Sequence, residues 1–257
     1  MSRALRRRLL AVAVTAATGL TILAGCADPP SPTTPAHRAV MGWLVRDGQA
    51  CGATAQEVRE QAAALVDRGL TELGFTTLYL GCPGTALRGD AGLRRDLAAE
   101  GLHLEVLAQG QWPLTEVVST RMPRAAAFRT AVTRRLMAAG PLLYSGPVAE
   151  MTDEVLADVA NREIIELSLD DRRAPGAAIN GDPDLWSRAI GDQGLLVSLT
   201  NGGTGEAERS VPIAALNLAG ADSVPAHDVW TGTRLVSADG LLTVRLAASD
   251  SALLRIG

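Results

Sequence analysis

The chain lacks lysine, contains little histidine and has no apolar run long enough to cross a bilayer. All 24 basic residues are arginine, and 28 residues are acidic. Residues 1–25 hold four of the arginines, so the rest of the chain has 20 basic and 28 acidic residues, a net charge of −8. This acidic balance argues against nucleic acid as a partner, because phosphate binding needs a basic patch. His37, His103 and His227 lack metal-ligand spacing, so we expect neither a metal site nor a cofactor.

The N-terminus has the pattern of a secretory signal. Four arginines before residue 9 precede an apolar run from Leu9 to Leu23. This run is shorter than the roughly 20 residues that a membrane-spanning helix needs, which favours a cleaved signal over residues 1–25. Its ending, Leu23-Ala24-Gly25-Cys26, resembles the bacterial lipobox, whose cysteine is lipidated. The resemblance implies that Cys26 carries a lipid anchor and that the protein lies on the extracellular side of the cell membrane.

Three regions follow the signal. Residues 26–38 are rich in proline, serine and threonine and predict a flexible tether. Residues 39–175 alternate short apolar strands with amphipathic helices, a pattern typical of right-handed βαβ units around a parallel sheet. Residues 180–257 contain short strands of period two separated by turns such as Asp239-Gly240, and these predict an antiparallel β-sandwich.

Local signals predict individual elements. Thr54 and Glu57 form a capping box for a helix over residues 54–69, with Val58, Ala62, Leu65 and Val66 facing inward. A second helix is predicted over residues 90–100, with Leu93 and Leu97 inward. Further helices are expected over residues 129–139 and 152–161, and strands over residues 78–80, 102–107, 195–201, 228–232 and 241–246.

Two blocks of the chain carry motifs of one enzyme family. The first runs from Met41-Gly42-Trp43 through Cys51 to Leu80-Gly81-Cys82, and the second contains Met137–Leu143, Pro147–Thr152 and Glu163–Asp170. They resemble the M-G-W-x-x-W, D-D-C-W, M-A-A-P-L-L, D-V-R-x-M-S and E-V-I-A-V-N-Q-D motifs of glycoside hydrolase family 27, the α-galactosidases. The resemblance implies a (β/α) barrel followed by a β-sandwich, and it is weak between Pro83 and Pro123.

The length of the first region excludes a complete barrel. His37 to Asp170 contains 134 residues, whereas an eight-unit barrel takes about 250. At roughly 30 residues for each βα unit, four or five units fit. We therefore expect a shortened barrel-like parallel sheet, either a reduced barrel or an open sheet, with the sandwich covering part of its exposed flank.

The catalytic residues that the family resemblance implies are missing. A retaining glycosidase needs two carboxyl groups about 5–5.5 Å apart. The tandem aspartates of the family correspond to Leu80 and Gly81, and no segment resembles its K-Y-D nucleophile motif. Residues 111–117 match either the acid/base strand or the sugar-binding C-E-W-P-L strand, and a carboxylate is lost in both alignments. Asp182-Pro183-Asp184 resembles the acid/base motif D-P-D-M but is also ordinary turn chemistry.

We therefore expect a surface lipoprotein that binds carbohydrate and has no hydrolytic activity. Arg46 and Asp47 end the first strand, where a barrel binds its ligand, although a surface ion pair is the alternative there. Further candidate ligand contacts are Gln111 and Trp112. Two other functions stay open: an active glycosidase with displaced carboxylates, or a structural envelope protein that binds another protein. The weak catalytic candidates are Glu105 with Glu116 or Asp170.

The resemblance also implies a disulfide between Cys51 and Cys82. Export to an oxidising compartment permits this bond. By the chain-entropy model, closing a loop of about 30 residues would contribute roughly 3–4 kcal/mol. The alternative is a pair of buried free thiols.

Overall fold

A five-stranded parallel sheet forms the first part of the chain. The computed structural model describes residues 41–46, 52–82, 85–107, 117–170, 174–192, 194–218 and 223–257. The sheet has the order β3-β2-β1-β5-β4, and every neighbouring pair is parallel. The strands are β1 (Met41–Leu44), β2 (Thr77–Leu80), β3 (His103–Val106), β4 (Val118–Ser119) and β5 (Leu142–Ser145).

The strand order is that of a barrel opened at one side. The last strand, β5, pairs with the first, β1, with Trp43 opposite Tyr144. A closed barrel requires this pairing of its first and last strands. Within the described residues, no strand pairs with the outer edge of β3 or β4. The expected shortened parallel sheet is therefore confirmed, and its described strands form an open sheet.

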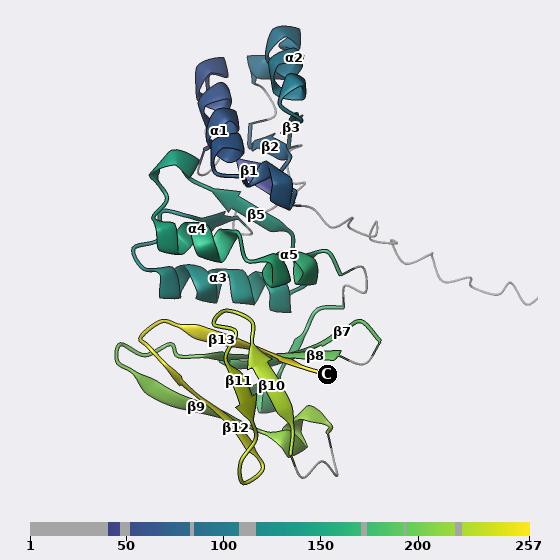
Figure 1. Ribbon diagram of the computed structural model, residues 1–257, viewed down its shortest axis with the longest axis vertical. Coiled ribbons are helices and arrows are strands. Elements are labelled where there is room, and N and C mark those ends of the chain that lie inside the picture. The colour runs from purple at the N-terminus through teal and green to yellow at the C-terminus, as the bar shows by residue number, and fades with distance from the viewer. Residues whose placement is uncertain are drawn as a thin grey trace, which may run out of the picture. The chain divides into compact units, whose positions relative to one another are not determined.

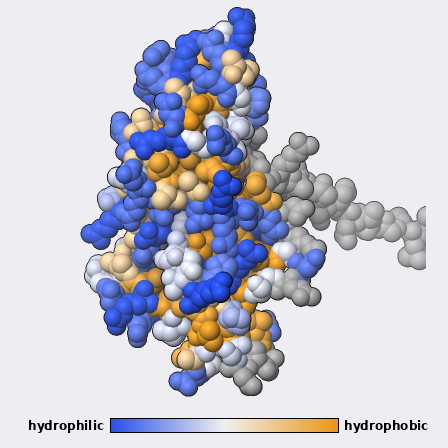
Figure 2. Space-filling view, in the orientation of Figure 1, coloured by the Kyte–Doolittle hydropathy of each residue, from blue (hydrophilic) through white to orange (hydrophobic). Residues whose placement is uncertain are grey.

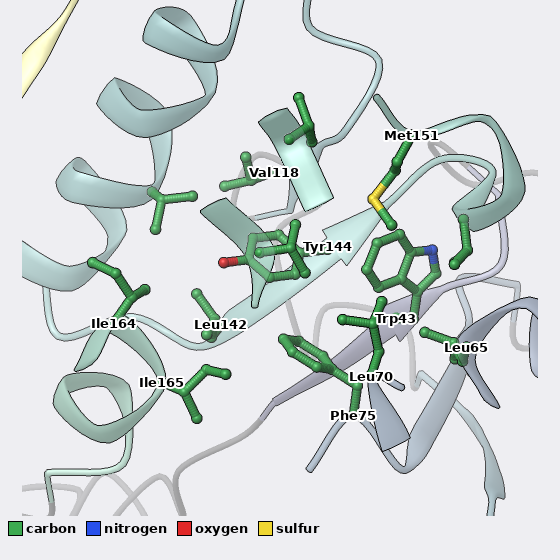
Figure 3. Packing of buried hydrophobic residues seen from close by; sticks show 14 of the residues in the cluster. Trp43, Leu65, Leu70, Phe75, Val118, Leu142, Tyr144, Met151, Ile164 and Ile165 are labelled. Atoms are coloured by element: carbon green, nitrogen blue, oxygen red, sulfur yellow. The ribbon is translucent and has the colours of Figure 1, made fainter. Parts of the chain in front are cut away.

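Helices cover one face of this sheet (Figure 1). Successive strand residues point to opposite faces, so Trp43 and Tyr144 join the main core with the helices, as Figure 3 shows. Leu44, Tyr79 and Leu143 form a smaller cluster on the other face. The helices are α1 (Ala55–Asp67), α2 (Ala91–Ala99), α3 (Ala125–Met137), α4 (Asp153–Val159) and α5 (Arg162–Ser168), with 3-10 turns η1 (Thr71–Leu73), η2 (Ala86–Gly89), η4 (Val148–Glu150), η5 (Ile179–Gly181) and η6 (Ile213–Leu216).

Antiparallel strands form the second part of the chain. A six-stranded sheet has the order β11-β10-β13-β8-β7-β6, and β12 pairs with β9 in a separate ribbon. Val197, Leu199 and Leu254 of the large sheet pack with Val211 and Leu242 of the ribbon, which confirms the predicted sandwich. The strands are β6 (Ala177–Ala178), β7 (Leu185–Ile190), β8 (Gly194–Thr200), β9 (Ala207–Pro212), β10 (Pro225–Asp228), β11 (Arg234–Val236), β12 (Leu241–Leu246) and β13 (Ser251–Ile256).

The sandwich packs on the helical layer rather than on an exposed flank of the parallel sheet, contrary to our expectation. Helix α3 contacts β7, β8 and β13, and it lies between the two sheets in Figure 1. Leu196 and Leu253 point from the large sheet into the same core as Trp43. The main core therefore extends from the parallel sheet through α3 to the large sheet, while the interior of the sandwich forms a separate cluster, and residues 37–257 form one compact unit.

Two local predictions are wrong. Val66 is 41% exposed, because the buried stripe of α1 consists of Val58, Ala62 and Leu65. Of residues 228–232, only Asp228 lies in a strand, at the end of β10, and the rest form a turn. The Asp228 carboxylate accepts the Trp230 N–H, and the Asp228 carbonyl accepts the Gly232 N–H.

The surface in Figure 2 is mostly hydrophilic, with smaller apolar groups between the charged residues. None of the described helices combines the length and hydropathy that a membrane span needs.

Candidate functional site

A polar groove follows the carboxyl ends of β1, β5 and β4. It consists of two hollows of about 570 and 390 Å³ that share Arg121, Pro147 and Glu150. Arg46 follows β1, Pro147 follows β5 and Arg121 follows β4. We call this feature the strand-end groove. The carboxyl ends of parallel strands are where βα proteins place their ligand sites.

Buried hydrogen bonds fix the floor of the groove. The Trp43 indole N–H donates to the Gly146 carbonyl at 2.8 Å, and the Thr120 hydroxyl donates to the Ser145 carbonyl at 2.9 Å. A Cβ on Gly146 would lie 2.5 Å from the Thr120 hydroxyl, and Gly146 has a φ of 103°, so only glycine fits there. The loops that follow β4 and β5 are therefore held against β1.

Arg46 lines the groove, as predicted, but its guanidinium is already paired. Its Nε donates to Glu57 Oε1 at 3.1 Å. The pKa of Glu57 is lowered, first by the Thr54 backbone N–H and then by Arg46. Arg46 therefore forms the surface ion pair that was the alternative for this position, with Glu57 as its partner. Asp47 lies outside the described residues.

The glutamates of the groove come from helices rather than from strand ends. Glu57 and Glu60 belong to α1, Glu150 to η4 and Glu154 to α4. The described residues at the strand ends are Arg46 after β1, Gly81 and Cys82 after β2, Leu107 after β3, Thr120 after β4 and Gly146 after β5. None of these carries a carboxylate, so the described strand ends do not supply the acid pair of a glycosidase.

Glu105 does not reach the groove. It lies in the middle of edge strand β3, is exposed, and stands opposite Tyr79. Glu105 shares the helix-free face of the sheet with Tyr79, but its side chain is solvated because β3 is the edge strand. Burial, together with the Glu105 charge, raises the pKa of Tyr79 to about 12.

The other described acidic candidates have structural partners. Asp170 Oδ2 lies 3.6 Å from the buried Arg188 guanidinium. Asp182 and Asp184 each lie 3.6 Å from Arg209, and Asp182 Oδ1 accepts the Asp184 N–H. The Asp-Pro-Asp segment is therefore a turn, as its sequence also suggested.

Several predicted residues lie outside the described part of the chain: Cys26, Asp47, Cys51, Gln111, Trp112 and Glu116. Cys82 is buried and disulfide-bonded, and its pairing with Cys51 stays a prediction. His227 Nε2 lies 2.8 Å from Glu163. No cluster of metal-ligating side chains occurs among the residues described.

The sequence analysis missed Gln61, Arg121 and Glu150. Gln61 Oε1 accepts the Val148 N–H at 3.1 Å and ties α1 to the loop after β5. Arg121 and Glu150 lie 3.9 Å apart at the middle of the groove. Arg121 follows β4, and Glu150 lies in the loop after β5, so their positions at strand ends could have indicated a site. Strand β4 is only two residues long, however, and its sequence shows no strand pattern.

Comparison with known proteins agrees with this architecture. Residues 180–256 match the family model for the alpha galactosidase C-terminal beta sandwich domain. The chain is 28% identical over 115 residues to a probable alpha-galactosidase A of Aspergillus terreus, a match that covers 44% of this chain and 22% of that protein. The chain resembles the α-galactosidases of glycoside hydrolase family 27. It spans about a fifth of the length of this curated relative.

Solved α-galactosidase structures share the fold. α-Galactosidase I of Mortierella vinacea superposes with a TM-score of 0.70 at 14% identity, covering 88% of this chain and 98% of that one. The Saccharomyces cerevisiae α-galactosidase gives a TM-score of 0.68 at 11% identity, with 89% and 99% covered. At these identities the likeness establishes the α-galactosidase-like fold alone.

Proposed function

We propose that this protein is a lipid-anchored surface protein that binds a galactoside in the strand-end groove without hydrolysing it. The absence of carboxylates from the described strand ends carries this proposal, because the groove is present while the described strand ends supply no acid pair. The anchor is Cys26, as the lipobox resemblance implies.

The size and lining of the groove support carbohydrate binding. Its larger hollow, about 570 Å³, lies within the roughly 300–1,000 Å³ typical of small-molecule sites. The Arg121 and Glu150 side chains are 62% and 72% exposed, and their 3.9 Å contact is too long for a hydrogen bond. Their donors and acceptors therefore remain available to sugar hydroxyls. A related fold, the Saccharomyces cerevisiae α-galactosidase, has been solved with raffinose.

The loss of hydrolysis follows from the chemistry of the missing groups. Positioned acid/base catalysis contributes about 10²–10⁴-fold, and a covalent nucleophile is required in addition. Glu57 and Glu150 do not replace the missing nucleophile and acid/base. Each lies beside an arginine and belongs to a helix or turn rather than to a strand end.

The test combines turnover with binding. We expect the purified protein to release no aryl leaving group from an aryl α-galactoside above the buffer rate. We also expect it to bind raffinose in a calorimetric titration, with binding weakened in Arg121→Gln and Glu150→Gln. Arg95→Gln on the exposed surface of α2 is the matched control and should bind normally.

Two results would contradict this function. Turnover that collapses in Glu105→Gln or Glu116→Gln would establish the active glycosidase instead. Raffinose binding that is undetectable, or that is equal in Arg121→Gln and wild type, would remove the groove from the proposal and favour the protein-binding alternative.

A further inference from the structure

A second hollow lies between α3 and the six-stranded sheet. Its volume is about 210 Å³, and it shares no residue with the strand-end groove. Its main lining residues are Arg134 and Met137 from α3, Pro183 from the turn before β7, Trp186 from β7, and Ser198 and Thr200 from β8. We call it the α3 groove.

One wall of the α3 groove is flat, apolar and fixed. The Trp186 indole N–H donates to the Pro183 carbonyl at 2.9 Å, so the ring is oriented by its own turn. Met137 borders the same space. Aromatic rings and the apolar faces of other rings stack favourably on such a surface.

A serine hydroxyl lies beside this wall without a hydrogen-bond partner among the described residues. Ser198 stands directly opposite Trp186 on the neighbouring strand and is 3% exposed. Thr200, two residues further along β8, shares a hydrogen bond with Ser251 at 2.9 Å. Ser198 makes no such bond with any described residue. The oxygen itself is not fully buried, so the hydroxyl is reachable from the groove and is an available donor and acceptor there.

The positively charged side chain of Arg134 lines the α3 groove. Arg134 lies in the last turn of α3, is exposed, and forms no ion pair with a described residue. Arg129, one turn earlier on the same helix, has both Asp250 and Asp158 as partners. The planar guanidinium of an unpaired arginine suits a carboxylate, which it binds through two parallel hydrogen bonds.

We propose that the α3 groove binds a small monocarboxylate built on one six-membered ring. The ring stacks on Trp186 and Pro183, a ring substituent or carboxylate oxygen meets the Ser198 hydroxyl, and the carboxylate pairs with Arg134. The volume, about 210 Å³, is below the roughly 300 Å³ at which sites for drug-sized ligands begin, so one ring is the fitting size. An aromatic acid and a sugar acid share this chemistry.

The experiment uses the full exported chain and two probes, phenylacetate and D-galacturonate. The indole N–H resonance of Trp186, assigned from its loss in Trp186→Phe, is followed during titration. We expect a saturable shift with at least one probe. Binding of phenylacetate would identify the ligand as an aromatic acid, and binding of D-galacturonate would identify it as a sugar acid. Benzyl alcohol and D-galactose, which lack the carboxylate, should bind about tenfold more weakly, because the pairing of a carboxylate with an exposed guanidinium contributes about one order of magnitude in total.

Two variants separate the proposed contacts from folding. Arg134→Gln should weaken binding about tenfold, whereas Arg95→Gln, which removes the same charge from α2, should not. Ser198→Ala should weaken binding without lowering the melting temperature, since it removes a hydroxyl that forms no bond in the free protein.

The proposal is overturned if neither acid gives a saturable shift, or if Arg134→Gln and Arg95→Gln bind alike. Arg121→Gln tests its independence from the strand-end groove: that variant should lose raffinose binding and retain binding of the acid.

Discussion

Within β1, Gly42 and Trp43 occupy adjacent positions that point to opposite faces of the parallel sheet. Trp43 is fully buried, with ring centroids 6.2 Å from Phe75 and 5.8 Å from Tyr144. On the other face, a Cβ at Gly42 would lie 2.5 Å from Tyr79 Cε2 and 2.6 Å from the Thr77 carbonyl. The Met-Gly-Trp motif therefore satisfies the packing on both faces of β1: glycine leaves room for Tyr79 on one face, and tryptophan fills the core on the other.

Gly42→Ala should destabilise the protein by about 1–3 kcal/mol, because the added methyl forces Tyr79 and the neighbouring backbone to move. The measurement is chemical denaturation at neutral pH. Gly92→Ala is the matched control: Gly92 lies in α2 with only Asp90 Oδ1 nearby, at 3.3 Å. There the same substitution should stabilise the protein slightly, because alanine favours a helix. Equal effects at both sites would show that strand crowding is not the cause.

Asp158 is a second residue whose environment predicts a measurable effect. Its burial, with added repulsion from Glu154 and Asp250, outweighs the attraction of Arg129 and raises its pKa to about 6. The unfolded value is about 3.9. Because the native state holds this proton more tightly, Asp158 favours folding below pH 4, and that contribution is lost as the pH rises through 6.

Asp158→Asn should therefore be more stable than wild type at pH 8, by about 1 kcal/mol, and show no gain at pH 4. The shift, which already includes the attraction of Arg129, sets an upper limit of roughly 3 kcal/mol, and solvent screening of this carboxyl reduces it. Thermal melts at both pH values test this. Asp153→Asn, exposed in the first turn of the same helix, should not gain stability. A variant less stable than wild type at pH 8 would mean that the ion pair outweighs the burial.

At the scale of elements, sequence patterns predicted best where the signal was local. The capping box of α1 and the apolar stripes of α1 and α2 located these helices to within two residues, and period-two alternation gave β12 with its observed bounds. The strand predicted over residues 228–232 was wrong. Val229 and Trp230 are residue types typical of strands, but the Asp228 carboxylate accepts the Trp230 N–H and stabilises a turn instead. In the site, the position of Arg46 was predictable, but its partner Glu57 was not, since a side-chain pairing depends on how α1 packs.

The N-terminus of α1 offers a test at this scale. The Thr54 hydroxyl accepts the Glu57 N–H, while Glu57 accepts the Thr54 N–H at 2.7 Å and pairs with Arg46. Thr54→Ala should destabilise the protein by about 1 kcal/mol, because one helix donor loses its acceptor. Thr54→Ser keeps the hydroxyl and should remain close to wild type in the same denaturation experiment. If the two variants lose equal stability, the threonine methyl rather than the cap is responsible.

At the scale of the whole molecule, the length of residues 37–170 excluded a complete eight-unit barrel but left a reduced barrel and an open sheet as alternatives. The α-galactosidase-like motifs located β1, β2 and β5, whereas β3 and β4 lie where the resemblance is weak. The sequence could not indicate where the sandwich packs. That depends on α3 presenting apolar residues to two sheets, and on the partners that its polar residues find in the sandwich. The Arg129 guanidinium reaches Asp250, and the Thr130 hydroxyl reaches the Ser249 carbonyl. Such contacts join residues more than 100 positions apart, and no local pattern encodes them.

The proposed location at the membrane depends on one atom, the Cys26 sulfur. Two or more acyl chains hold a protein stably at a bilayer, whereas a single chain gives only marginal binding. We propose that this lipid supplies the membrane affinity. Cys26→Ser should therefore move the protein from the membrane fraction to the soluble fraction, or leave it as an uncleaved precursor.

Fractionation with intact-mass analysis distinguishes the two outcomes, and Ser31→Ala in the tether is the control that should stay anchored. Retention and processing of Cys26→Ser at the wild-type level would disprove the anchor, while leaving the galactoside groove and its binding test unaffected.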